Sequence, residues 1–155
     1  MSAATLHATV SPSASMDEAE ILALGGALHK AHLERNPEGI AAPYAPHAVI
    51  YDLEPPLSHD GISVERKRKW LDTWDTPIEL IAQNFKVTVS GDHAWGHGYL
   101  RMSGTPKAAG RPISFWMRST VCFERIDGAW RIVHEHTSVP IYMDGSLRPA
   151  FDLQP

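Results

Sequence analysis

The chain has 155 residues, of which 43% are hydrophobic and 21% charged, enough apolar material for one compact domain with a buried core. Its net charge of −4 and its pI of about 6.1 give no electrostatic footprint for nucleic acid, and no apolar run is long enough to cross a bilayer. The single cysteine, Cys122, excludes an intrachain disulfide. We expect a cytoplasmic protein with no membrane partner, because the first sixteen residues also lack the pattern of a signal peptide.

The first part of the chain predicts a long helix. Ser15 followed by Glu18 is a capping-box pattern, and apolar residues then recur at helical spacing up to Asn36. We therefore expect a helix over residues 16–35, preceded by a flexible N-terminus of residues 1–15.

A strand and a second long helix follow. A short helical segment is expected over residues 39–44, and the segment HAVIYDL over residues 47–53 is rich in strand formers. Residues 61–75 have helical periodicity, with Trp70 and Trp74 on one side and a basic run on the other. We expect that basic run to be the solvated side of the helix.

From residue 77 onward the hydrophobic period is that of β-strands. Turn sequences separate four strand-like segments, at residues 78–89, 93–102, 113–126 and 130–139. Helices followed by an antiparallel meander predict an α+β fold in which the helices cover one face of the sheet. We expect this domain to span residues 16–142 and residues 143–155 to form an irregular tail.

The turn at residues 127–128 sets the register that we expect for the last two strands. A tight hairpin at this Asp-Gly pair places Phe123 opposite Ile132 and Val121 opposite His134. A slip of one residue would exchange the two faces, so the orientation of every later side chain depends on this turn.

In that register the two histidines of RIVHEHTSVP lie on the mainly apolar face. Burial there favours neutral imidazole and makes His134 and His136 candidates for acid/base work. The alternative is that each histidine is only a hydrogen-bonded part of the core. Glu135 is expected on the opposite face, diagonal to Arg118.

The element order and two segments, FWMRSTVCFERIDGAWRIVHEHTSVP and VIYDLEPPL, resemble the SnoaL-like, ketosteroid-isomerase-like branch of the nuclear transport factor 2 superfamily over residues 17–142. The resemblance implies a cone, in which a strongly curved antiparallel sheet wraps around a pocket capped by helices, and dimerisation through the outer sheet face. We expect a homodimer with Arg118 and Glu135 at that interface. The likeness extends to the association domain of calcium/calmodulin-dependent kinases, which is an assembly module.

Isomerases of this type use an aspartate base, while a tyrosine and a protonated carboxylic acid hold the developing oxyanion. Asp52 is the candidate base, because strand alternation through Ile50 places it at the pocket end of the strand. The alternative role for Asp52 is structural, as a carboxylate that caps the following loop. Tyr99 could supply a hydroxyl. The expected register offers no second buried carboxylate, so the chain departs from this plan. Related cyclases also use an aspartate, for which His134 or His136 could be the proton partner.

The sequence also supplies candidates for a wall around a flat, apolar ligand, although each of them could simply be core. These residues are Trp70, Trp74, Tyr99, Met117 and Phe123. The H-x-H pair with His97 or Asp52 has the ligand types for zinc or non-haem iron. The resemblance implies neither, and we expect no metal and no cofactor.

These observations together predict a cofactor-free acid/base enzyme, an isomerase, cyclase or hydratase, with a small apolar carbonyl compound as its partner. Asp52, His134 and His136 are the predicted catalytic residues. The alternative is a module without catalysis, which binds a small ligand or mediates oligomeric association.

Overall fold

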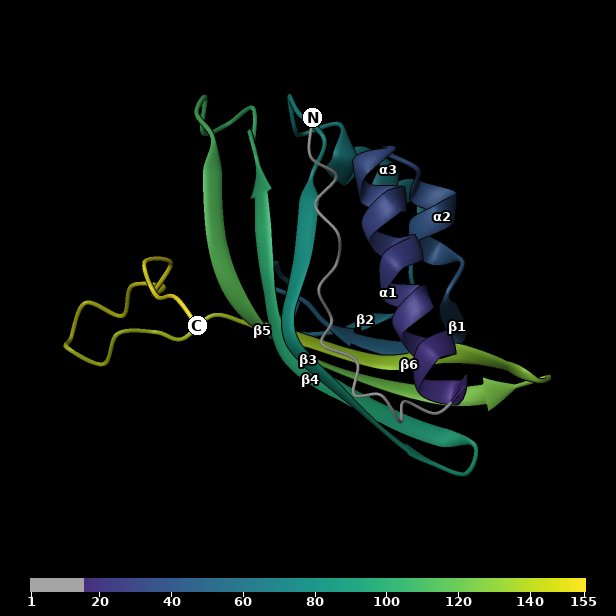
Figure 1. Ribbon diagram of the computed structural model, residues 1–155. Helices are drawn as coiled ribbons and strands as arrows, with labels where there is room; N and C mark the ends of the chain where they lie inside the picture. Colours follow the sequence, from purple (N-terminus) through teal and green to yellow (C-terminus); the bar gives the residue numbers. More distant parts are fainter. Residues whose placement is uncertain (1–15) are drawn as a thin grey trace, which may run out of the picture.

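The computed structural model describes residues 16–155, which form a curved six-stranded sheet with three helices on its concave side (Figure 1). The helices are α1 (Met16–Leu33), α2 (Pro37–Ala41) and α3 (Val64–Leu71). The strands are β1 (Tyr44–Tyr51), β2 (His59–Asp60), β3 (Glu79–Ser90), β4 (His93–Gly104), β5 (Ile113–Ile126) and β6 (Ala129–Ser138). The predicted capping residue Ser15 and the predicted flexible terminus lie outside the described residues. None of the described helices is long and apolar enough to span a membrane.

The strands lie in the order β2-β1-β6-β5-β4-β3, and the α+β class predicted from the sequence is confirmed. Strands β3 to β6 form the predicted antiparallel meander. The expectation of a wholly antiparallel sheet is wrong in one place, because β1 pairs with β6 in parallel. This parallel pairing places the end of β1 beside the RIVHEHTSVP segment.

The three long strands β3, β4 and β5 bend, so that the sheet is concave toward the helices (Figure 1). A register shift in β3 surrounds Asn84, whose φ of 53° is left-handed. Beside it Phe85 lies directly against β4. A Cβ added to Gly98 would be 2.7 Å from Cα of Phe85, and one added to Gly96 would be 2.5 Å from its ring. The two glycines therefore permit the close approach of β3 and β4 at this point.

The core consists of two apolar clusters under the helices. The first joins Ile21 of α1 to Trp130 and Ile132 of the last strand. The second lies under α2 and α3 and includes Ile40 and Trp74. Between the clusters the helices leave a hollow against the sheet.

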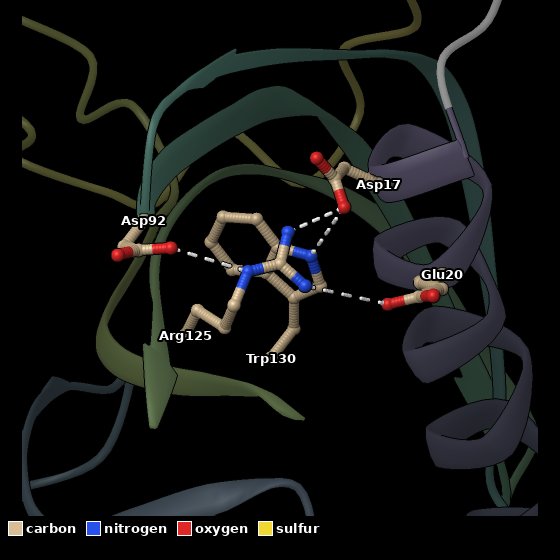
Figure 2. A network of polar contacts seen from close by, with 5 residues as sticks. All are labelled: Asp17, Glu20, Asp92, Arg125 and Trp130. Carbon is tan, nitrogen blue, oxygen red and sulfur yellow. Dashed lines mark hydrogen bonds and ion pairs between the residues drawn. The ribbon is translucent and has the colours of Figure 1, made fainter. Parts of the chain in front are cut away.

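Arg125 of β5 connects the first turn of α1 to the turn between β3 and β4 (Figure 2). Its guanidinium donates a hydrogen bond to Asp17 in the first turn of α1, and its Nε lies 3.3 Å from Asp92 Oδ1 after β3. The guanidinium also lies 4.5 Å from the ring centroid of Trp130. The hydrogen bond from Arg125 lowers the pKa of Asp17, so this carboxylate is held in its charged form.

Candidate active site

An extra residue in β6 reverses the faces that the sequence predicts for its second half. The β5–β6 hairpin starts in the predicted register, but the register shifts after Phe123 and leaves Val133 as a β-bulge. Every later side chain of β6 therefore points to the opposite face from the one predicted. Glu135 lies on the concave face, whereas His134 and His136 lie on the outer face.

The predicted orientation of the two histidines is thus wrong. Nδ1 of His134 donates to the backbone carbonyl of Val49 at 2.7 Å. The ring of Tyr51 lies edge-on to both imidazoles, at centroid distances of 4.9 Å from His134 and 5.6 Å from His136. The histidines form an aromatic cluster on the outer surface. Within residues 16–155 no group of three His, Cys, Asp or Glu side chains is arranged to hold a metal ion.

The two residues predicted for the dimer contact lie on opposite faces of the sheet. Arg118 lies on the outer face, where its Nε donates to Ser138 Oγ at 3.2 Å and where Tyr99 is its neighbour on β4. Glu135 lies in the cavity and is not available for that surface. The homodimer itself stays a prediction, now with Arg118 alone at the proposed contact.

A cavity of about 680 Å³ lies between the helices and the concave face, a size common for small-molecule sites. Its wall is mainly apolar and includes, among others, Leu24, Leu28, Leu100, Met102, Phe115 and Val121. Five of the predicted site residues line it, namely Asp52, Trp70, Trp74, Met117 and Phe123. Tyr99 is 39% exposed and does not line it, because it lies on the outer face with Arg118. Whether the lining residues bind a ligand stays a prediction.

Tyr44 and Glu135 form a hydrogen-bonded pair in the wall of this cavity. The phenol of Tyr44 on β1 donates a short hydrogen bond to Oε2 of Glu135 on β6. Burial raises the pKa of Glu135; the hydrogen bond from Tyr44 opposes the rise, and the charge of Asp52 adds to it. Burial and the neighbouring Glu135 also raise the pKa of Tyr44. Burial therefore shifts Glu135 toward its neutral acid form, and Oε1 is the oxygen that does not accept the hydrogen bond from Tyr44.

Asp52 reaches the cavity as predicted and is paired there with Lys67 of α3. The Nζ of Lys67 lies 3.6 Å from Oδ2 of Asp52, and the side chains are only 14% and 30% exposed. The other oxygen, Oδ1, accepts the backbone N–H of Leu53 at 2.7 Å, so the predicted loop contact is present as well. Lys67 also lies 5.0 Å from the ring centroid of Trp70. The ammonium balances the carboxylate inside a mainly apolar wall.

His32 of α1 completes the polar end of the cavity. Its Nδ1 donates to the carbonyl of Leu28 at 2.7 Å, and its ring lies edge-on to Trp70 at 6.1 Å. Burial lowers the pKa of His32 to about 4, so the imidazole is neutral at neutral pH.

A family model for the SnoaL-like domain matches residues 21–142. The chain belongs to the SnoaL-like family. This SnoaL-like chain is 28% identical to an NTF2-like protein of unknown function from Pseudomonas putida KT2440, with a TM-score of 0.80 over 92% of this chain and 99% of that chain. No curated protein matches it.

Two further solved structures are similar to the SnoaL-like chain in fold alone. A candidate dehydratase of the NTF2-like family from Streptomyces avermitilis is 15% identical, with a TM-score of 0.68 over 81% of this chain and 96% of that chain. A candidate calcium/calmodulin-dependent protein kinase II association domain from Xanthomonas campestris is 22% identical, with a TM-score of 0.69 over 83% of this chain and 91% of that chain. One fold therefore carries names from different functional classes, and the function has to be argued from the site.

Sequence reasoning missed several polar residues of the SnoaL-like site, among them Tyr44, Glu135, His32 and Lys67. Tyr44 was expected to end a short helix, and Glu135 was placed on the wrong face. His32 was only one position in a helical pattern. Lys67 belongs to the basic run, but its spacing of three from Trp70 puts both on one helix face, a signal that was available.

Proposed function

We propose that the protein is a cofactor-free acid/base enzyme that moves a proton on a small apolar carbonyl compound. The observation that carries the proposal is the presence of two partly buried carboxyl groups in different environments within one mainly apolar cavity. Asp52 is paired with the ammonium of Lys67, whereas Glu135 is paired with a phenol and has a raised pKa. Two carboxyl groups with different environments supply a base and an acid at the same pH.

In the proposed mechanism Asp52 accepts a proton from the carbon beside the carbonyl group. Negative charge then develops on the carbonyl oxygen, and Glu135 as a neutral acid donates a hydrogen bond to it. Tyr44 holds Glu135 in place by donating to its other oxygen. The return of the proton from Asp52 to a different carbon completes an isomerisation. A cyclisation or the removal of water would use the same enolate.

The β-bulge at Val133 favours the mechanism with Asp52 and Glu135 over the mechanism in which His134 or His136 moves the proton. It turns Glu135 into the cavity and so supplies the second carboxyl group that the expected register lacks. Asp52, Tyr44 and Glu135 then provide the three residue types of the isomerase-type plan, although Tyr44 donates to Glu135 and not to the substrate oxygen. They stand on or directly after β1 and on β6, which are neighbours in the sheet.

The test is hydrogen exchange at carbon. The protein is incubated in D2O with 1-tetralone or 2-decalone, and loss of the hydrogens beside the carbonyl is followed by NMR. We expect the protein to accelerate exchange and Asp52→Asn to reduce the rate at least about 100-fold, because a general base contributes about 10²–10⁴-fold. Asp72→Asn is the matched control, since Asp72 is an exposed carboxylate at the end of α3.

Binding is measured on the same samples from the change in tryptophan fluorescence, since Trp70 and Trp74 line the cavity. Exchange that survives Asp52→Asn would remove that residue from the proposed mechanism. Ligands that bind to the wild type without any exchange would instead indicate the alternative, a module that binds a small ligand without catalysis.

A further inference from the structure

The wall of the cavity contains a buried hydroxyl that the proposed mechanism does not use. Ser119 is 3% exposed, and within the described part of the chain its Oγ has no hydrogen-bond partner. It lies on the concave face of β5, between Met117 and Val121 on the same face, and it lines the cavity. Buried polar groups in proteins almost always have a partner, so an unpartnered hydroxyl in a cavity wall indicates a polar group on the ligand.

A second hydroxyl stands next to Ser119. Thr137 of β6 is its partner in the sheet, is 8% exposed and lines the same cavity. The neighbour of Ser119 on the other side is Gly98 of β4, which has no side chain that could hydrogen-bond to the hydroxyl. A hydroxyl both donates and accepts hydrogen bonds, so this pair fits a hydroxyl or a carbonyl oxygen.

The hydroxyl pair is separate from the proposed acid. Thr137 lies two residues beyond Glu135 on the same face of β6, which corresponds to about 6.6 Å along the strand. Ser119 lies diagonally across from Glu135, at a Cα separation of about 7–8 Å. The hydroxyl pair and the carboxyl group of Glu135 therefore occupy two different points of the cavity wall.

We propose that Ser119 determines specificity by hydrogen-bonding a second oxygen of the ligand, with Thr137 beside it. The substrate class is then an apolar ring compound with two oxygen functions, a carbonyl at Glu135 and a hydroxyl or second carbonyl at Ser119. The position of the carbonyl rests on the proposed function, but the contact with Ser119 does not, since binding alone tests it.

The experiment compares 1-tetralone with its 5-hydroxy, 6-hydroxy and 7-hydroxy derivatives, which are isomers of one another and differ in the position of one hydroxyl on the same ring. Dissociation constants are measured by calorimetry for the wild type and for Ser119→Ala. We expect at least one hydroxyl isomer to bind the wild type about tenfold more tightly than 1-tetralone, the effect of about one hydrogen bond. Ser119→Ala should abolish that gain and leave the affinity for 1-tetralone unchanged.

The matched control is Thr120→Ala, which removes the adjacent hydroxyl on the exposed outer face of β5 and should change neither affinity. The inference is overturned if no isomer gains over 1-tetralone, or if Ser119→Ala keeps the gain.

A measurement without ligand provides a second test. Because Oγ of Ser119 has no partner among residues 16–155, Ser119→Ala should have a melting temperature equal to or above that of the wild type. A clear fall in melting temperature would assign the hydroxyl a structural role and overturn the inference. Isomer binding through Ser119 without proton exchange would sustain this inference while overturning the proposed function.

Discussion

Tyr44 donates its phenolic hydrogen to Glu135 across the parallel pairing of β1 with β6. Two irregularities in the sheet accompany this contact. β6 contains the bulge at Val133, and β1 shifts its register between Tyr44 and Val49. The bulge sets Glu135 on the concave face, where Tyr44 can reach it. The acid of the candidate site is thus produced by departures from regular strand geometry, which are frequent beside active sites.

Replacement of Glu135 by glutamine should remove a pH dependence of stability. The pKa of Glu135 is raised in the folded state, so its stability contribution is complete below the usual value of 4.5 and is lost as pH rises through the raised value. The free energy of unfolding, measured with urea across this range, should decline for the wild type relative to Glu135→Gln. Glu124→Gln, on the partly exposed part of β5, is the control. Parallel curves for the wild type and Glu135→Gln would show that the carboxyl group is not perturbed.

His32 should produce the opposite dependence. Its folded pKa is about 4, below the usual 6.5, so its contribution is present above pH 6.5 and is lost as pH falls through about 4. The gap between these values corresponds to about 3 kcal/mol in the free energy of unfolding. His32→Gln should flatten that part of the curve. His93→Gln should not, because the side chain of His93 is 72% exposed. An imidazole of His32 that titrates near 6.5 by NMR would contradict the expectation.

The outward histidines should be dispensable for proton exchange. The double variant His134→Gln/His136→Gln removes both imidazoles from the outer face, where neither lines the cavity. We expect the exchange rate to stay within about twofold of the wild type, since surface substitutions away from a site have small effects. A loss as large as that expected for Asp52→Asn would return the histidines to the mechanism.

Periodicity alone was enough to predict the helices and the meander. Trp70 and Trp74 four positions apart indicate one helix face, and both line the cavity. Strand alternation likewise places Asp52 at the cavity end of β1. These predictions hold because they depend on local spacing within one element.

The candidate site was only partly predictable, because the bulge at Val133 reverses the face of every later side chain in β6. Val133 is an ordinary strand former, and neither glycine nor proline marks the bulge. The parallel partner β1 is far away in the sequence, so the contact between Tyr44 and Glu135 has no local signal. Resemblance to the family suggested an aspartate, a tyrosine and a buried acid, but the last two could be assigned only once the register was known.

Two glycine substitutions should have opposite effects on stability. Gly98→Ala places a Cβ 2.7 Å from the backbone of Phe85, where β3 and β4 approach closely, and overpacking of this kind costs about 1–3 kcal/mol. Gly26 in α1 has no atom within 4 Å of an added Cβ, so Gly26→Ala should stabilise the helix by about 0.5–1 kcal/mol. Urea denaturation of both variants checks the contrast. Equal effects would mean that the bend does not depend on Gly98.

Removal of the guanidinium at Arg125 should loosen the first turns of α1 and leave the rest of the helix protected. Arg125 joins Asp17 of that helix to Asp92 after β3, and its plane lies against Trp130 (Figure 2). We expect Arg125→Gln to increase amide hydrogen exchange in the first turns of α1, measured by mass spectrometry. Arg111→Gln, at an exposed site in the loop before β5, is the control.

The same contact should weaken in acid. The pKa of Asp17 is lowered by Arg125, so the stabilisation is present above the usual value of 3.8 and is lost as pH falls through the lower one. Exchange in the first turns of the wild type should therefore approach that of Arg125→Gln at low pH, once the intrinsic pH dependence of exchange is removed. High salt should act in the same direction, because the carboxylates around Arg125 are partly exposed. Unchanged protection in Arg125→Gln would mean that other contacts, such as the packing of Ile21 and the hydrogen bond from Trp130 to Asp17, hold the start of α1 on the sheet.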